Sequence, residues 1–494
     1  CLVGSEMCIR DSIYNMAMNK TTDNNKQPTR RAYSLDALRG YAILTMVLSA
    51  TVVYGILPAW MYHAQEPPPT HAYQPDLAGL TWVDLVFPFF LFAMGAAFPF
   101  SLRRKYEKGC SMWQLAYGAV KRGVQLMFFA IFIQHFYPYM LSAPQDVRAW
   151  LLALACFAVL FPMFMRIPLK MPEWAHTSIK LGAYGVATAM LLCTDYANGA
   201  EFNLFTSNII ILLLANMALF GSLTYLLTMY SWWARVAVLA ALAGVVLSAQ
   251  ADGSWAQMLW GYTPVPWMYR FEYLRYLFIV LPGSMAGELV MKWMSRPTSE
   301  DGAESPPRKV AYAMLCISVG IILANLVGLY NRWSFLTLIL SALLILAGWW
   351  LTRGLSDSGI LWHDLLLLGA ALLLVGLCFE PFQGGIKKDG PTFGYLFVTS
   401  GLGCMALMAF HVVCDYFCCH RSTSFLVMSG QNPMIAYVAC DLLIYPLFNL
   451  LGIMKWLGIF ATNPWLGFLQ GLLLTSMALL VTMFFTRIKW FWRT

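Results

Sequence analysis

Long runs of hydrophobic residues separated by short polar segments fill nearly the whole chain. Each run is close to the roughly 20 residues that a helix needs to cross a bilayer. The pattern predicts an all-α, polytopic integral membrane helix bundle with about 14 transmembrane helices, in a range of about 10–14. The run 149–165 is short, and the pairs 205–250 and 310–352 leave a re-entrant alternative open. The predicted spans are 41–60, 82–102, 118–139, 149–165, 178–196, 205–229, 233–250, 271–293, 310–330, 333–352, 361–379, 394–417, 425–450 and 464–486.

The composition supports a membrane protein and indicates which kinds of partner to expect. Of the 494 residues 60% are hydrophobic and 11% are charged, whereas a soluble globular chain carries about 25% charged residues. The net charge of +8 arises from basic residues at the ends of the apolar runs and not on one face. We therefore expect membrane lipid as a partner and no nucleic acid.

The basic residues also predict an orientation. Alternate polar segments hold nearly all of them, the 61–80 segment has none, and Lys387 and Lys388 are the main exception. The positive-inside rule then places both termini in the cytoplasm and the 61–80 segment outside. The segments predicted inside contain Arg30, Arg31, Arg103, Arg104, Lys105, Lys108, Lys121, Arg122, Arg166, Lys170, Lys292, Arg296, Arg308, Lys309, Arg487, Lys489 and Arg493.

Two polar segments bound the predicted domain organisation. Residues 1–33 form an expected N-terminal tail, whose first part, 1–12 (CLVGSEMCIRDS), resembles a translated sequencing adaptor and is expected to be disordered. Residues 34–494 form the transmembrane domain, with a flexible cytoplasmic linker near 295–307. No repeat relates the two halves, which argues against an inverted-repeat transporter.

A titratable loop runs directly into a charged helix start between residues 61 and 95. His63 and His71 lie in this loop, and a histidine can act as a general base near neutral pH or carry an acyl group transiently. Asp84 lies one turn into the next apolar run, where an acid is costly and usually faces a protein interior or a cavity. The spacing fits either solvated loop histidines or an imidazole that works beside Asp84.

Three other polar groups have both a structural and a functional interpretation. Asp36 and Arg39 are three residues apart and share a helix face. They could form an internal ion pair, bind a phosphate through Arg39, or be a snorkelling pair of charges at the membrane interface. Asn432 precedes a proline and either presents its amide to a cavity or caps a helix. A third group lacks the paired short spacings of a zinc site, so we expect no metal: His411, Cys414, Asp415, Cys418, Cys419 and His420.

Three motifs occur in a specific order: LDALRG at 35–40, GLTWVDLVFPFF at 79–90 after His71, and GQNPMIAY at 430–437. Together they resemble the transmembrane acyltransferases related to heparan-α-glucosaminide N-acetyltransferase, especially the bacterial branch long described only as a domain of unknown function. Lys387–Lys388 and LPGSMAG at 281–287 fit the same family.

The resemblance implies transfer of an acetyl group from cytoplasmic acetyl-CoA to an amino sugar or sugar hydroxyl on the periplasmic side of a bacterial inner membrane. It assigns catalysis to His71, which is nearer to the GLT motif than His63 and is likewise followed by alanine, with Asp84 orienting the imidazole or the acceptor. We expect no permanently bound cofactor, and a homodimer is left open. Substrate contacts are expected from Asp36, Arg39, His63, Asn432, Lys387 and Lys388, and CoA-phosphate contacts from Arg103, Arg104, Lys105, Lys121 and Arg122.

Two departures from the family pattern lie beside the expected acceptor pocket. The link after His71 is longer than usual and lacks a tryptophan, and Ser49–Thr51 replaces an asparagine that is common in the first span. The identity of the acceptor is therefore the property that the resemblance determines least. The alternatives are a transporter or flippase of a sugar or lipid-linked glycan without bond chemistry, and an inactive relative of the enzymes.

Overall fold

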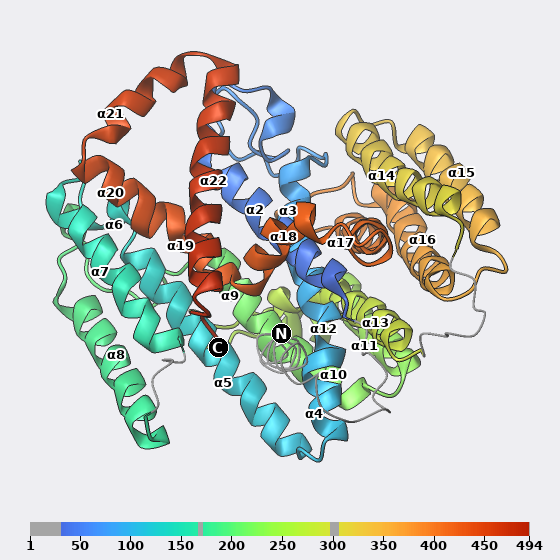
Figure 1. Ribbon diagram of the computed structural model, residues 1–494, viewed down its shortest axis with the longest axis horizontal. Coiled ribbons are helices and arrows are strands. Elements are labelled where there is room, and N and C mark those ends of the chain that lie inside the picture. The colour runs from blue at the N-terminus through green and yellow to red at the C-terminus, as the bar shows by residue number, and fades with distance from the viewer. Residues whose placement is uncertain (1–30, 166–170, 297–305, 494) are drawn as a thin grey trace, which may run out of the picture.

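The computed structural model describes residues 31–165, 171–296 and 306–493, which form an all-α bundle without strands in these ranges (Figure 1). Most of the predicted tail and linker, 1–30 and 297–305, lies outside the described residues. The described ranges contain 11 helices that are long and apolar enough to cross a membrane, which confirms the predicted fold class. These are Trp82–Glu107, Met112–His135, Val147–Phe164, Ile209–Thr228, Phe271–Met294, Arg308–Tyr330, Ser334–Thr352, Ser358–Phe382, Phe393–Tyr416, Pro433–Leu450 and Pro464–Arg487.

Several of these spans combine consecutive helical segments, and other helices pack beside them. The principal helices are α2 (Tyr33–Thr51), α3 (Trp82–Ala96), α4 (Arg104–Glu107), α5 (Met112–His135), α6 (Pro138–Leu141), α7 (Val147–Phe164), α8 (Glu173–Cys193), α9 (Ile209–Asn216), α10 (Ser222–Thr228), α11 (Trp232–Ser248) and α12 (Trp255–Trp260). They continue as α13 (Leu277–Met294), α14 (Arg308–Tyr330), α15 (Ser334–Thr352), α16 (Ser358–Phe382), α17 (Phe393–Phe410), α18 (His420–Gln431), α19 (Pro433–Ala439), α20 (Tyr445–Leu450), α21 (Ile453–Leu457) and α22 (Pro464–Arg487).

Two predicted span boundaries are wrong. The first helix covers Tyr33–Thr51 and not 41–60, because the chain turns extended at Val52 and passes through Gly55 at φ +80°. The run 425–450 divides at Asn432, since a proline disfavours helical backbone in the residue before it. The pair 310–352, which left a re-entrant alternative open, forms two separate helices, α14 and α15, that pack along each other.

Two sequence motifs meet where α2 crosses α18. A Cβ atom added at Gly40 would lie 1.8 Å from the carbonyl oxygen of Leu426, and one added at Gly430 would lie 2.0 Å from that of Asp36. Nη1 of Arg39 also donates to the carbonyl of Gly430 at 3.2 Å. The LDALRG and GQNP motifs are therefore two halves of one close backbone contact.

A second close crossing joins α3 to α13. A Cβ atom would lie 2.0 Å from the carbonyl oxygen of Val280 at Gly95, 2.3 Å from that of Phe92 at Gly283, and 2.0 Å from that of Ala96 at Gly287. Small residues at this spacing let helices in a membrane approach closely. The crossing fixes α3, which carries Asp84.

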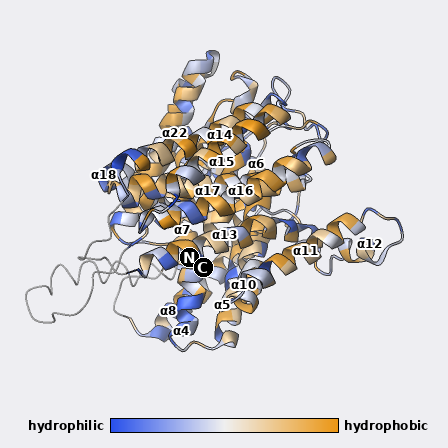
Figure 2. Cartoon of the chain, turned by 90° about the vertical axis from the view of Figure 1, so that its right-hand side faces the viewer, coloured by the Kyte–Doolittle hydropathy of each residue, from blue (hydrophilic) through white to orange (hydrophobic). Residues whose placement is uncertain are grey.

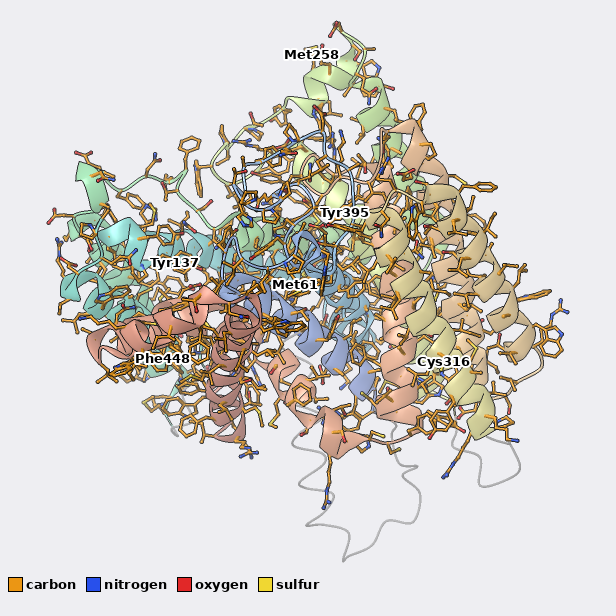
Figure 3. The ribbon with its side chains drawn as sticks, turned by 90° about the horizontal axis from the view of Figure 1, so that it is seen from above. Met61, Tyr137, Met258, Cys316, Tyr395 and Phe448 are labelled. Atoms are coloured by element: carbon orange, nitrogen blue, oxygen red, sulfur yellow. The ribbon has the colours of Figure 1, made fainter. Side chains whose placement is uncertain are left out.

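The helices are arranged around α2 and α3, with peripheral groups on either side. Cys316 of α14 and Phe448 of α20 lie on opposite sides of the bundle (Figure 3). The α11–α12 segment extends away from the remaining helices, most of which are strongly hydrophobic (Figure 2).

The bundle has two ends that differ in chemistry. The loops 52–80 and 383–392 meet at the histidine end, where the backbone N–H of Gly79 donates to the carbonyl of Ile386 at 2.9 Å. The span Trp82–Glu107 runs from there to the opposite, basic end, defined by residues 103–111. The rise from Asp84 to Lys105 is about 30 Å at 1.5 Å per residue, close to the thickness of a bilayer core.

We predict that Gly287→Ala destabilises the protein by about 1–3 kcal/mol, because the new Cβ meets a backbone carbonyl that cannot move without shifting α3. The measurement is the midpoint of thermal unfolding in detergent, read by size-exclusion chromatography. Gly185→Ala in α8 is the matched control, since a Cβ there meets nothing within 4 Å. Equal midpoints for the two variants would contradict the close crossing.

Candidate functional site

A buried carboxylate at the start of α3 holds an imidazole. Nδ1 of His63 lies 2.7 Å from Oδ1 of Asp84, whose side chain is 2% exposed. Oδ2 of Asp84 accepts from the backbone N–H and the hydroxyl of Thr81, both at 3.0 Å, and from the N–H of Ala64 at 3.2 Å. Asp84 therefore caps its own helix with one oxygen and positions His63 with the other.

This pairing corrects the assignment of the imidazole. Nδ1–H of His71, the histidine predicted to work with Asp84, instead donates to the carbonyl of Glu66 at 3.1 Å. Its ring packs against Tyr54 and Tyr62, with centroid distances of 4.3 and 4.5 Å. Both histidines are followed by alanine, so that neighbour does not distinguish His63 from His71.

A buried glutamine joins the two loops at the histidine end. Oε1 of Gln65 accepts from the backbone N–H groups of Lys388 and Asp389 at 3.1 and 2.8 Å, and Nε2 donates to the carbonyls of Pro75 and Asp389 at 3.2 Å. The clamp places Nζ of Lys388 at 3.2 Å from both ring nitrogens of His63. Because the ammonium of Lys388 is equally far from Nδ1 and Nε2, it lies on the plane that bisects the imidazole ring between them. It is therefore not in line with the lone pair of Nε2.

A cavity of about 360 Å³, here called the histidine cavity, opens beside His63. Burial and then the Glu66 carboxylate raise the pKa of Tyr54 above its ordinary value, so its hydroxyl stays protonated and can donate to a ligand. The cavity combines apolar walls with convergent polar groups, as ligand sites do. The polar lining is Ser49, Thr51, Tyr54, Tyr62, His63, Glu66, Tyr437 and Asp441.

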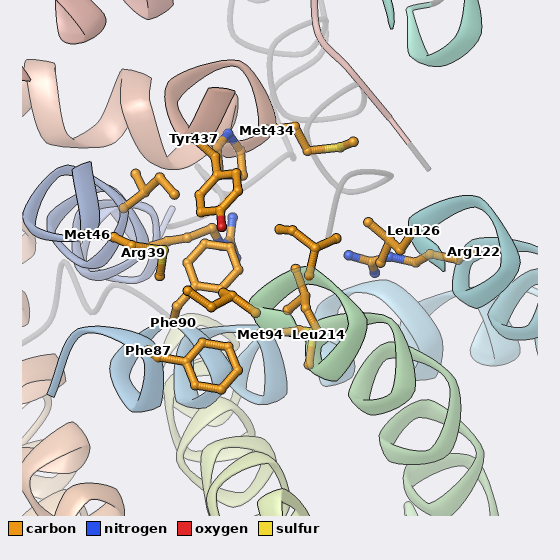
Figure 4. Close-up of a pocket in the computed structure, with 14 residues that line it drawn as sticks. Arg39, Met46, Phe87, Phe90, Met94, Arg122, Leu126, Leu214, Met434 and Tyr437 are labelled. Atoms are coloured by element: carbon orange, nitrogen blue, oxygen red, sulfur yellow. The ribbon is translucent and has the colours of Figure 1, made fainter. Parts of the chain in front are cut away.

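A narrow apolar passage of about 50 Å³ continues from this cavity toward the basic end. Met46, Ile210 and Tyr437 line both spaces. Figure 4 shows Arg39 of α2 and Arg122 of α5 extending into the passage from opposite sides, with Phe87 and Phe90 of α3 below.

A third space of about 320 Å³, the basic cavity, lies at the far end of the passage, and Arg122 lines both. Its walls hold several cations from separate elements: Lys105, Lys121, Arg122, Lys180 and Arg493. Three of the five residues predicted to hold CoA phosphates are thus gathered here, together with two that the sequence did not indicate.

The other two predicted phosphate contacts lie elsewhere. Arg103 pairs with Glu107 at 2.8 Å and stacks over Tyr230, while Arg104 lies over the ring of Phe100. Neither lines the basic cavity. Both fit a role in anchoring the end of the span.

Of the remaining predicted substrate contacts, some face the cavities and others are engaged in contacts elsewhere. Asp36 and Arg39 form an internal ion pair at 3.4 Å, with Arg39 facing the passage. Lys387 pairs with the fully exposed Asp76 at 3.3 Å. Asn432 is corrected to a structural role, because Nδ2 donates to the carbonyl of Trp490 and Oδ1 accepts from the N–H of Trp492.

The group of metal-ligand residue types around α17 serves packing and capping. Asp415 accepts from the first N–H groups of α2, those of Tyr33 and Ser34. His411 is buried and accepts at Nδ1 from the indole N–H of Trp362 at 3.0 Å. Within the described ranges no group of three or more His, Cys, Asp or Glu residues could hold a metal ion.

The site includes two carboxylates whose place sequence reasoning missed. Asp441 lies inside the span Pro433–Leu450, and Glu66 lies in the loop, yet both line the histidine cavity. No hydrogen bond or ion pair reaches either carboxylate from the described part of the chain. The available signal was the cost of an acid within an apolar run, which predicts a cavity or an interior partner.

Comparison with known proteins gives a family and no activity. The model of a family described as "Domain of unknown function (DUF5009)" matches residues 31–290, more than half of the chain. This range contains His63, Asp84 and Arg122, and it ends before Lys388 and Asp441. No curated protein matches the chain.

We predict that Gln65→Leu loosens the junction of the two loops, because four hydrogen bonds to backbone groups are lost, each contributing about 0.5–1.5 kcal/mol. Hydrogen–deuterium exchange should accelerate at residues 61–66 and 386–390. Gln257→Leu, which also removes bonds within a turn, should accelerate exchange only near 250–257. Unchanged protection at 386–390 in the first variant would contradict the clamp.

Proposed function

We propose that this chain, which belongs to the DUF5009 family, is a membrane-bound acyltransferase that moves an acetyl group from acetyl-CoA at the basic end to an amino sugar or sugar hydroxyl at the histidine end. The observation that carries the proposal is the series of three adjoining spaces: a basic cavity, a narrow apolar passage and a cavity with a paired imidazole. The resemblance of the sequence motifs to the relatives of heparan-α-glucosaminide N-acetyltransferase supports the same activity.

The basic end suits the phosphates of CoA. Arg122 is half-buried within a span, its buried Nε has no hydrogen-bond partner, and no carboxylate pairs with it in the described ranges. Arg39 faces the same passage but is paired with Asp36, so the uncompensated charge there is that of Arg122. Buried charge of one sign is costly unless it is compensated, so an anionic ligand fits this place. The pantetheine arm would then follow the apolar passage toward His63.

The histidine end suits general base catalysis. With Nδ1–H of His63 donated to Asp84, Nε2 holds the lone pair and can take a proton from an attacking amine or hydroxyl. Attack on the thioester carbonyl forms the new bond, the C–S bond breaks, and the thiolate of CoA takes up a proton. His71, which is packed between two tyrosines, would shape the loop and not exchange the proton.

The lining of the passage argues for transfer over transport. A sugar or lipid-linked glycan that crosses the bundle would need a wide polar conduit, but the passage between the two cavities is lined mainly by apolar side chains, among them Phe87, Phe90 and Met94. An extended thioester arm needs far less width than a glycan. The acceptor can therefore stay at one end while only the acyl donor reaches through.

We predict that His63→Gln lowers acetyl transfer by about 100-fold or more, the usual effect of losing a general base. The assay measures label moved from radiolabelled acetyl-CoA to a panel of amino sugars and their hydroxyl counterparts, with protein in nanodiscs. His71→Gln is the matched control and should retain at least about a third of the activity. Full activity in His63→Gln with loss in His71→Gln would restore the first assignment, and no label on any acceptor with wild type would reject the enzyme.

We also predict that Arg122→Gln raises the dissociation constant of CoA by roughly 10-fold to 100-fold, because a charge-assisted contact contributes about 1.5–3 kcal/mol. Isothermal titration calorimetry with CoA alone gives the value. Arg148→Gln is the control, since Arg148 pairs with Asp195 near the start of α7, outside the basic cavity. Equal affinity in both variants would remove Arg122 from the CoA site.

A further inference from the structure

Asp441 is an acid inside an apolar span that lines the histidine cavity. It lies in the middle of the span Pro433–Leu450, one turn after Tyr437, and both residues line the histidine cavity. An ionisable group at such a position usually pairs with another or faces a ligand path. Since no cation or hydrogen-bond donor of the described residues reaches its carboxylate, the partner must come from the cavity.

Glu66 adds a second carboxylate from another direction. It lies in the loop that follows His63, its backbone N–H donates to the carbonyl of His63 at 3.0 Å, and its own carbonyl contacts His71. These bonds fix the main chain of Glu66, yet its side chain has no partner in the described ranges. The one nearby histidine that faces the cavity, His63, already donates to Asp84.

The cavity therefore presents two carboxylates without partners among the described residues, beside the imidazole of His63. Hydroxyl groups can donate to carboxylates, but a hydroxyl brings no charge to offset two half-buried carboxylates that have no partner among the described residues. An ammonium group does, and a charge-assisted hydrogen bond is roughly twice as strong as a neutral one. Tyr54 and Ser49 remain as donors for the neutral part of the ligand.

We propose that the carboxylates of Asp441 and Glu66 bind the ammonium group of the acceptor. They would thereby favour amines as acceptors and bind the amide product more weakly, so that it is released. The inference rests on the proposed transferase activity. Transfer forms an N–C bond and breaks the C–S bond, while the ammonium gives up two protons, one to the CoA thiolate and one through His63 to solvent. The product nitrogen is a neutral amide, which loses its attraction to both carboxylates.

The test is a binding measurement that needs no turnover. Glucosamine and N-acetylglucosamine, as minimal probes, are titrated into wild type, Asp441→Asn and Glu66→Gln in nanodiscs without acetyl-CoA. Wild type should prefer the amine by at least about tenfold. Asp441→Asn should remove most of this preference by weakening only the amine, and Glu66→Gln should reduce it in part. Glu201→Gln, an exposed loop residue, controls for net charge.

The outcomes separate the two proposals. His63→Gln should keep the tenfold preference although it loses transfer, because it leaves both carboxylates in place. Equal affinity of wild type for amine and amide, or a preference that survives in Asp441→Asn, overturns the inference while transfer activity can still stand. Weaker binding of both probes by Asp441→Asn would show a structural role and also overturn it.

Discussion

The site depends on one carboxylate that satisfies two demands. Asp84 closes the first turn of α3 through Oδ2 and holds the ring of His63 through Oδ1. A charge in this place is tolerated because four donors surround it, including the backbone N–H of Ala64. The same bonds that make the charge acceptable in an apolar bundle also set the position and tautomer of the imidazole, so stability and chemistry cannot be separated at this residue.

The rest of the bundle keeps that carboxylate at the head of a passage. The α3–α13 crossing through Gly283 and Gly287 fixes the helix, and the α2–α18 crossing through Gly40 fixes the wall that faces it. Charges then divide between the ends: cations gather at the basic cavity and unpaired acids at the histidine cavity. A donor rich in phosphate and an acceptor carrying positive charge would each meet the opposite sign.

The apolar periodicity alone predicted the helical bundle, because each span must satisfy its own backbone hydrogen bonds in lipid. The cost of a buried acid pointed to Asp84 for the same reason. Periodicity could not show that His63 reaches Asp84, since a loop of extended and turned residues brings distant positions together without a repeating pattern. Nor could it separate Lys105 from Arg104, which are adjacent in sequence but face a cavity and a phenyl ring respectively.

The loop between His63 and Gly79 is anchored at both ends. His63 pairs with Asp84, Gln65 is bonded to residues 388 and 389, and Gly79 is bonded to Ile386, so residues 67–78 form a segment that is held on both sides. A change of length or sequence within residues 67–78 leaves the bonds of His63 to Asp84 and of Gln65 to residues 388 and 389 in place. Sequence changes in this segment would alter the packing of His71 on Tyr54 and Tyr62, which line the histidine cavity, while the His63–Asp84 pair stays constant.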